Sequence, residues 1–151
     1  EQRKEQEQRI RRLEAEIAGL ESFSSHAVSP TTGKVYAQRS LREADPEEFD
    51  GFREKYEHIL EDRLEERMYK TDNNVSRRLN ELAQDLGRWD AGPRDVTELH
   101  TRALKNKSRG VTYRRAQALS DEGRLIAIEL MGYLVSFYRN QTCVKTGCGN
   151  E

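Results

Sequence analysis

The spacing of apolar residues predicts four successive helices in the second two-thirds of the chain. The first begins at Asp45-Pro46, where an N-cap residue precedes a proline and two acidic residues, an order that is typical of a helix start. The predicted helices are residues 46–70, 75–86, 93–105 and 112–139, and Gly87 is the predicted stop of the second helix. Because the connections between them are short, neighbouring helices should run antiparallel. The sequence therefore predicts an all-α fold with a four-helix bundle over residues 46–140.

The last predicted helix carries the most apolar stretch of the chain. Over its last four turns it is apolar on nearly all sides, so a single neighbouring helix cannot cover it. It must either lie at the centre of the bundle or present a surface for self-association or for a partner. The residues that we expect on such a dimer or partner surface are Leu99, His100, Leu104, Leu130, Met131, Leu134, Phe137 and Tyr138. The alternative is that half of them are core residues of one chain, because any helix in a bundle needs inward-facing residues.

A second apolar pattern occupies the N-terminal end of the chain. The residues spaced three, four and three apart there are Ile10, Leu13, Ile17 and Leu20. Isoleucine at the a positions and leucine at the d positions favour a parallel two-stranded coiled coil. We therefore predict that residues 1–22 form a coiled-coil arm that contributes to a homodimer. Two heptads are too few to dimerise alone, so a solvated linker helix is the alternative.

The segments outside these helices have a different composition. Residues 23–45 are rich in serine, threonine, proline and glycine, which predicts a long linker loop. Residues 141–151 show no helical periodicity, which predicts a flexible tail. Since the sequence begins without methionine inside the apparent heptad, we expect a piece of a longer regulator, joined through the coil to an upstream receiver or sensor domain.

Charge and composition narrow the classes of partner. The chain has 35% charged and 34% hydrophobic residues, so it either contains a long solvated helix or shares its core with a second copy. Its 26 basic and 27 acidic residues leave no overall field that would attract nucleic acid. One basic patch consists of Lys105, Lys107, Arg109, Arg114 and Arg115. Because no aromatic residues are interleaved with it, we expect a solvated surface and no nucleic-acid contact.

Cysteine usage and hydropathy favour a cytoplasmic protein. Both cysteines, Cys143 and Cys148, fall in the last nine residues, where they form no disulfide framework of the kind found in secreted domains. No apolar run approaches the ~18 residues that a membrane span requires. The charged N-terminal segment also does not resemble a signal peptide.

The sequence contains no recognisable catalytic or metal-binding pattern, so we expect neither an enzyme nor a bound cofactor. His26, His58 and His100 are scattered among different segments without metal-ligand spacing. Phosphate-binding glycine loops and nucleophile elbows are also absent from the sequence. His100 suggests one alternative, a phosphotransfer bundle in which this histidine accepts a phosphoryl group. An accepting histidine must be exposed, whereas Leu99 and Ala103 place His100 beside the apolar stripe.

Two short motifs resemble a known family of helical domains. The first is an acidic-then-apolar helix start formed by Pro93, Asp95, Val96, Leu99 and His100. The second, in the last helix, includes Leu130, Met131, Gly132, Tyr133, Phe137 and Tyr138. Together they resemble the bacterial domain shared by the N-terminus of the stress phosphatase RsbU and the C-terminus of the circadian protein KaiA, over residues 47–140. We expect no phosphatase domain after the bundle, as in KaiA, and the coil and long loop are not part of the shared domain.

The resemblance implies a non-catalytic dimeric bundle that binds and switches a kinase-type partner, a switch kinase for RsbU or the clock ATPase for KaiA. The sequence therefore predicts a homodimeric signalling adaptor, which forms the output part of a longer regulator. Phosphotransfer through His100 is one alternative. A purely structural oligomerisation module is the other.

Overall fold

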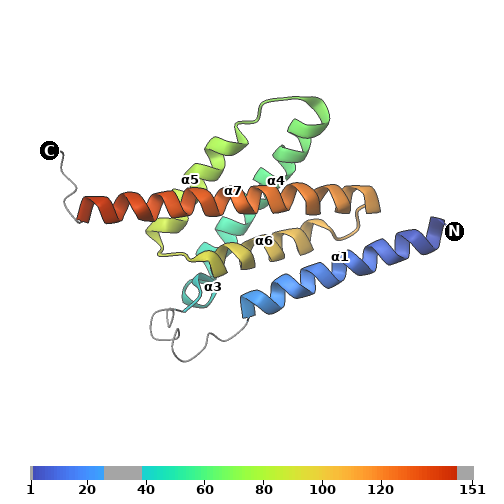
Figure 1. The fold of residues 1–151 in the computed structure, drawn as a ribbon, viewed down its shortest axis with the longest axis horizontal. Helices are drawn as coiled ribbons and strands as arrows, with labels where there is room; N and C mark the ends of the chain where they lie inside the picture. The colour runs from blue at the N-terminus through green and yellow to red at the C-terminus, as the bar shows by residue number, and fades with distance from the viewer. Residues whose placement is uncertain (1, 26–38, 146–151) are drawn as a thin grey trace.

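The predicted all-α class is confirmed. A computed structural model describes residues 2–25 and 39–145, and all regular elements in these ranges are helices. The helices are α1 (Gln2–Ser25), α3 (Leu41–Ala44), α4 (Pro46–Tyr69), α5 (Val75–Arg88), α6 (Pro93–Lys107) and α7 (Tyr113–Lys145) (Figure 1). None of the helices in the described part of the chain combines the length and the apolar character needed to cross a membrane.

The helix starts follow from local capping chemistry. At the start of α4, the Asp45 carboxylate accepts a hydrogen bond from the backbone N–H of Glu48 at 3.1 Å, which satisfies one of the free amides of the first turn. At the start of α6, the Asp95 carboxylate accepts hydrogen bonds from the N–H groups of Gly92 and Leu41, both at 2.8 Å. The second of these bonds also ties the start of α3 to α6.

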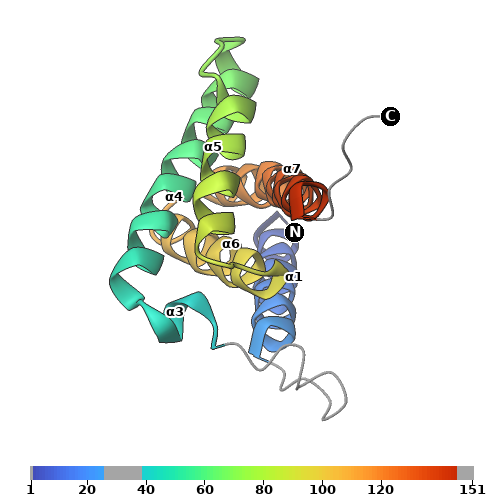
Figure 2. The same cartoon turned by 90° about the vertical axis from the view of Figure 1, so that its left-hand side faces the viewer.

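The bundle is built from two crossing groups of helices. Helices α6 and α7 form an antiparallel pair, and α1 lies beside them, antiparallel to α6 (Figure 1). Helices α4 and α5 form a hairpin that runs across this group (Figure 2). Ion pairs connect the two groups: Arg63 to Glu129 at 2.7 Å and Arg67 to Glu122 at 2.8 Å. Helix α7 therefore has α4 and α5 on one side and α6 and α1 on another.

Several predicted boundaries differ from the structure. Gly87 was expected to end its helix, but α5 continues to Arg88 and Gly87 is buried. A Cβ atom there would overlap the ring of Phe137, so glycine permits α5 and α7 to approach closely. Helix α7 extends to Lys145, into the predicted tail, and the short helix α3 lies in the predicted linker. Residues 26–38 of the linker and 146–151 of the tail lie outside the described residues.

The N-terminal helix does not extend away from the bundle as an arm. Helix α1 lies along α6 and also contacts the start of α7. The Arg124 guanidinium donates to the Glu16 carboxylate, with Nε 2.6 Å from Oε1, and Ile17 packs against the core. The apolar face expected to bind a second coil is thus covered in part by this chain's own α6 and α7.

Candidate functional site

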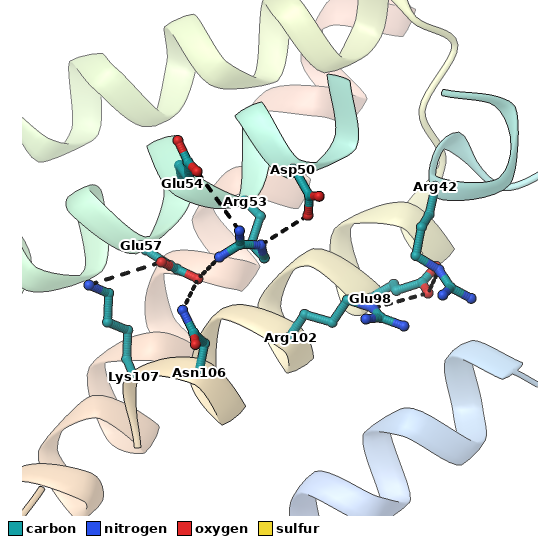
Figure 3. Close-up of polar contacts among 9 residues, drawn as sticks. All are labelled: Arg42, Asp50, Arg53, Glu54, Glu57, Glu98, Arg102, Asn106 and Lys107. Atoms are coloured by element: carbon teal, nitrogen blue, oxygen red, sulfur yellow. Dashed lines mark hydrogen bonds and ion pairs between the residues drawn. The ribbon is translucent and has the colours of Figure 1, made fainter. Parts of the chain in front are cut away.

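A network of charged side chains lies between α4 and α6 (Figure 3). At its centre is Glu57, whose side chain is only 8% exposed. Its Oε1 accepts hydrogen bonds from Arg53 at 2.5 Å and from Asn106 at 3.0 Å, and Lys107 Nζ lies 4.0 Å from Oε2. Burial alone would lower the pKa of Arg53, but hydrogen bonds to Glu57 and Asp50 outweigh it and raise this pKa. Arg53 is therefore held as a cation in a fixed position.

A second group of the same kind surrounds Glu98 on α6. The Glu98 side chain is largely buried and forms ion pairs with Arg42 of α3, at 2.5 Å, and Arg102 of α6, at 3.5 Å (Figure 3). Arg102 is the more exposed partner in its pair. The largely buried carboxylate of Glu98 thus restrains Arg102, as that of Glu57 restrains Arg53.

The two restrained arginines line one open depression. Its volume is about 330 Å³, and its lining residues are Glu21, Arg53, Arg102, Lys105, Asn106 and Arg109. Four of these six side chains are cationic. The single carboxylate in the lining, Glu21 of α1, forms an ion pair with Lys105 at 3.1 Å. An anionic group such as a carboxylate or a phosphate is the ligand that this charge distribution favours.

His100 is placed in the core and not at a surface. Its side chain is 4% exposed, and its Nδ1 is hydrogen-bonded to the Tyr56 hydroxyl at 2.8 Å. That hydroxyl also lies 3.3 Å from the Gly123 carbonyl oxygen, which accepts from it. The pKa of His100 is lowered to about 4, mainly by burial; Glu16 opposes this change and Arg124 adds to it. The imidazole is therefore neutral at pH 7 and shielded from any phosphoryl donor.

Most of the expected surface residues of the last two helices belong to the core of a single chain. The buried residues are Leu99, His100, Leu104, Leu130 and Leu134. The prediction that they lie on a dimer or partner surface was therefore wrong. The reason is that α7 is covered by helices on more than one side. The apolar character of its last turns is largely satisfied within one chain.

Three of the expected residues keep part of their surface. Met131, Phe137 and Tyr138 are partly exposed. The Tyr138 hydroxyl donates a hydrogen bond to the Ala91 carbonyl oxygen at 2.7 Å, and the rings of Phe137 and Tyr138 meet edge to face with centroids 5.4 Å apart. These contacts close the end of the bundle between α5 and α7.

Three of the four residues of the predicted coil, Ile10, Leu13 and Ile17, line a gap between α1 and the bundle. Ile10 is 43% exposed, and Leu13, Ile17 and Leu20 are partly exposed. A cavity of about 220 Å³ lies between this face and the α6–α7 connection. Its apolar lining comes from Ile10, Leu13, Ile17, Leu104, Val111 and Ala116. Helix α1 is thus seated on the bundle without complete packing.

Sequence reasoning missed two features. It did not identify Glu57 and Glu98 as buried centres of charge, and no pattern in the sequence distinguishes them from solvated glutamates. It also passed over the outer face of α7, where Leu125, Ile128 and Val135 are exposed. Their spacing of three and seven residues was a signal that could have separated them from the inward-facing leucines.

Within residues 2–25 and 39–145, no three His, Cys, Asp or Glu side chains are grouped so that they could hold a metal ion. Comparison of the chain with protein-family models, with curated proteins and with solved structures finds no match. The relation to the RsbU and KaiA domains stays a prediction from the two sequence motifs.

Proposed function

We propose that this chain is a non-catalytic, dimeric signalling adaptor that binds and regulates a protein kinase or an ATPase of the switch-kinase or clock-ATPase type. The observation that carries the proposal is the cationic depression between α4, α6 and the end of α1. Arg53 and Arg102 are held there by the buried carboxylates of Glu57 and Glu98. Restrained side chains lose less conformational entropy on binding, which favours a role in recognition.

The contact between α1 and the depression supports a regulatory role. Glu21 of α1 forms an ion pair with Lys105, and both residues line the depression. An acidic segment of a partner would compete with Glu21 for Lys105. A movement of α1, caused by an upstream receiver or sensor domain, would therefore change the affinity of the depression for its partner.

The burial of His100 disfavours phosphotransfer. A histidine that accepts a phosphoryl group must reach the donor, and His100 is enclosed by Tyr56, Gly123 and α1. Both cysteines, Cys143 and Cys148, fall in the last nine residues of the chain, an arrangement that offers no disulfide framework of the kind found in secreted domains. We therefore place the adaptor in the cytoplasm.

The test is capture of a partner by the chain and by two charge-reversed variants. In the first variant, Arg102→Glu and Lys105→Glu reverse the charge of the depression. In the matched control, Arg77→Glu reverses an exposed charge on α5. Captured proteins are identified by mass spectrometry, and a captured kinase or ATPase is then purified and assayed with each variant.

We expect the wild-type chain and the Arg77 variant to bind the same kinase or ATPase and to change its catalytic rate. The double variant should bind this partner at least about tenfold more weakly, because charge reversal replaces attraction by repulsion. The proposal fails if no kinase or ATPase is captured, or if the double variant binds it as tightly as the control. A chain that only self-associates would instead support the structural-module alternative.

A further inference from the structure

The outer face of α7 carries a continuous stripe of side chains that the described residues of this chain do not cover. Leu125, Ile128 and Val135 are 55%, 69% and 55% exposed, and Gly132 lies between them. Residues 121, 125, 128, 132, 135 and 139 follow one another at alternating separations of four and three, which places them on one face of a helix. A contiguous exposed apolar stripe with polar ends is typical of an interaction surface.

No contact in the described part of this chain requires a glycine at position 132. A Cβ atom added there would meet no other atom within 4 Å, and glycine weakens the interior of a helix relative to alanine. Alanine would therefore fit one chain better than glycine does. A glycine at the centre of an exposed stripe instead allows a large side chain from another helix to approach the backbone closely.

The charged residues at the two ends of the stripe have opposite signs. Asp121 lies one heptad, or about two helical turns, before Ile128, and Arg139 lies one heptad after Gly132. The Asp121 side chain is 53% exposed and is 3.6 Å from Arg124. Arg139 is exposed and forms no ion pair with any residue in the described ranges. The stripe therefore offers an acidic end, an apolar centre and a basic end.

From this order we infer that α7 packs antiparallel against α7 of a second copy of the chain, across a two-fold axis at the level of residue 130. The inference deepens the proposed function, because it names the dimer interface of the adaptor. In this register Asp121 faces Arg139 of the second copy, Leu125 faces Val135, and Ile128 faces Gly132. All three pairs occur twice, as a two-fold interface requires.

The antiparallel arrangement satisfies both charge and volume. A parallel pair would place Asp121 beside Asp121, Arg139 beside Arg139 and Gly132 beside Gly132. Like charges would then repel at both ends, and a gap would remain in the middle. The antiparallel pair joins opposite charges and fits each isoleucine over a glycine. The α4–α5 hairpin packs against one side of α7 (Figure 2), so it does not cover the exposed face that carries Leu125, Ile128 and Val135.

The first measurement is the mass of the 151-residue chain in solution, by light scattering over a range of concentrations. The test variant is Ile128→Glu, and the matched control is Met68→Glu, because Met68 is 65% exposed near the end of α4. We expect the wild type and the control to be dimers. The test variant should dimerise at least roughly tenfold more weakly, because a carboxylate buried at the interface without a partner is unfavourable.

The second measurement tests the register through charge. Asp121→Arg and Arg139→Asp should each weaken the dimer by roughly two- to thirtyfold, because each change affects two symmetry-related pairs of exposed charges. The variant with both substitutions should recover the wild-type affinity, since opposite charges again face each other. Circular dichroism of each variant checks that the fold is intact. Failure of the double substitution to restore the dimer overturns the antiparallel register.

Cross-linking gives an independent check of the same register. In a background with Cys143→Ser and Cys148→Ser, chains carrying Ile128→Cys are mixed with chains carrying Gly132→Cys and oxidised. The antiparallel pair predicts a disulfide between the two kinds of chain. Disulfides only between identical chains would indicate a parallel pair and overturn the inference.

These results are separable from those of the partner assay. A monomeric wild-type chain, or a dimer unaffected by Ile128→Glu, overturns the interface even if the chain still binds a kinase through Arg102. A dimer that behaves as expected supports the interface even if no kinase is captured. Partner binding and self-association therefore fail independently.

Discussion

The buried His100 should make the stability of the fold depend on pH. In the unfolded chain a histidine binds a proton below its ordinary pKa of about 6.5, whereas burial in the folded chain lowers the pKa of His100 to about 4. Between these pH values the unfolded state therefore holds more protons than the folded state. Stability should be highest above pH 6.5 and should fall as the pH falls towards 4, with no further loss from this group below that.

The size of the effect follows from the same pKa values. A pKa lowered from 6.5 to about 4 changes the free energy of unfolding by about 3 kcal/mol between the two ends of this pH range. Solvent does not appreciably reduce the effect of burial on this pKa, because the His100 side chain is only 4% exposed. The Glu16–Arg124 ion pair lies near the ring, and its two charges act on the imidazole in opposite directions.

The assay is urea unfolding at a series of pH values from 4 to 7.5, with unfolding monitored by circular dichroism at a fixed protein concentration. The control is His100→Gln, which keeps a group able to form a hydrogen bond with Tyr56 but does not titrate. Carboxylates and the other histidines contribute equally to both proteins, so the difference between the two pH profiles isolates His100. The wild type should lose about 3 kcal/mol more than the variant as the pH falls. Parallel profiles would refute the burial of His100.

Three further substitutions test the packing of the core by urea unfolding at pH 7. Tyr56→Phe should cost about 1–3 kcal/mol, because it leaves the buried Nδ1 of His100 without its hydroxyl partner; an unchanged midpoint would contradict that bond. Gly87→Ala should cost about 1–3 kcal/mol through overlap with the Phe137 ring, and Phe137→Leu in the same chain should recover part of it. Leu130→Ala should cost about 2–5 kcal/mol if Leu130 is a core residue, whereas a loss of only a few tenths would place it at a surface.

Local sequence signals predicted where the principal helices begin. The Asp45-Pro46 pair predicted the start of α4, and Pro93 with Asp95 predicted the start of α6. These signals work because capping depends on residues within one turn. The signal at Gly87 failed because glycine there serves a contact with Phe137, which comes from a helix 50 residues later in the chain. A local rule cannot distinguish a helix-ending glycine from one that permits close packing.

The faces of the helices were predictable, but their partners were not. The spacing of Ile10, Leu13 and Ile17 shows which side of α1 is apolar, and any helix with a complementary face could cover it. In the structure that cover comes from α6 and α7 of the same chain. For α7 the difficulty was different, because apolar residues on nearly all sides hide the distinction between the buried Leu130 and the exposed Ile128. Their spacing assigns the two residues to different faces of the helix, but only the arrangement of the neighbouring helices shows which of these faces is buried.

The depression and the α7 stripe involve different parts of the bundle, which affects how an adaptor built from two copies would work. The depression is formed by α4, α6 and the end of α1, whereas the stripe lies on the outer side of α7. A dimer formed through α7 would leave both depressions accessible, so each dimer would offer two binding sites to an oligomeric kinase or ATPase. Two linked sites raise the effective concentration for the second contact. The charged depression could therefore have modest affinity by itself and still hold a multimeric partner firmly.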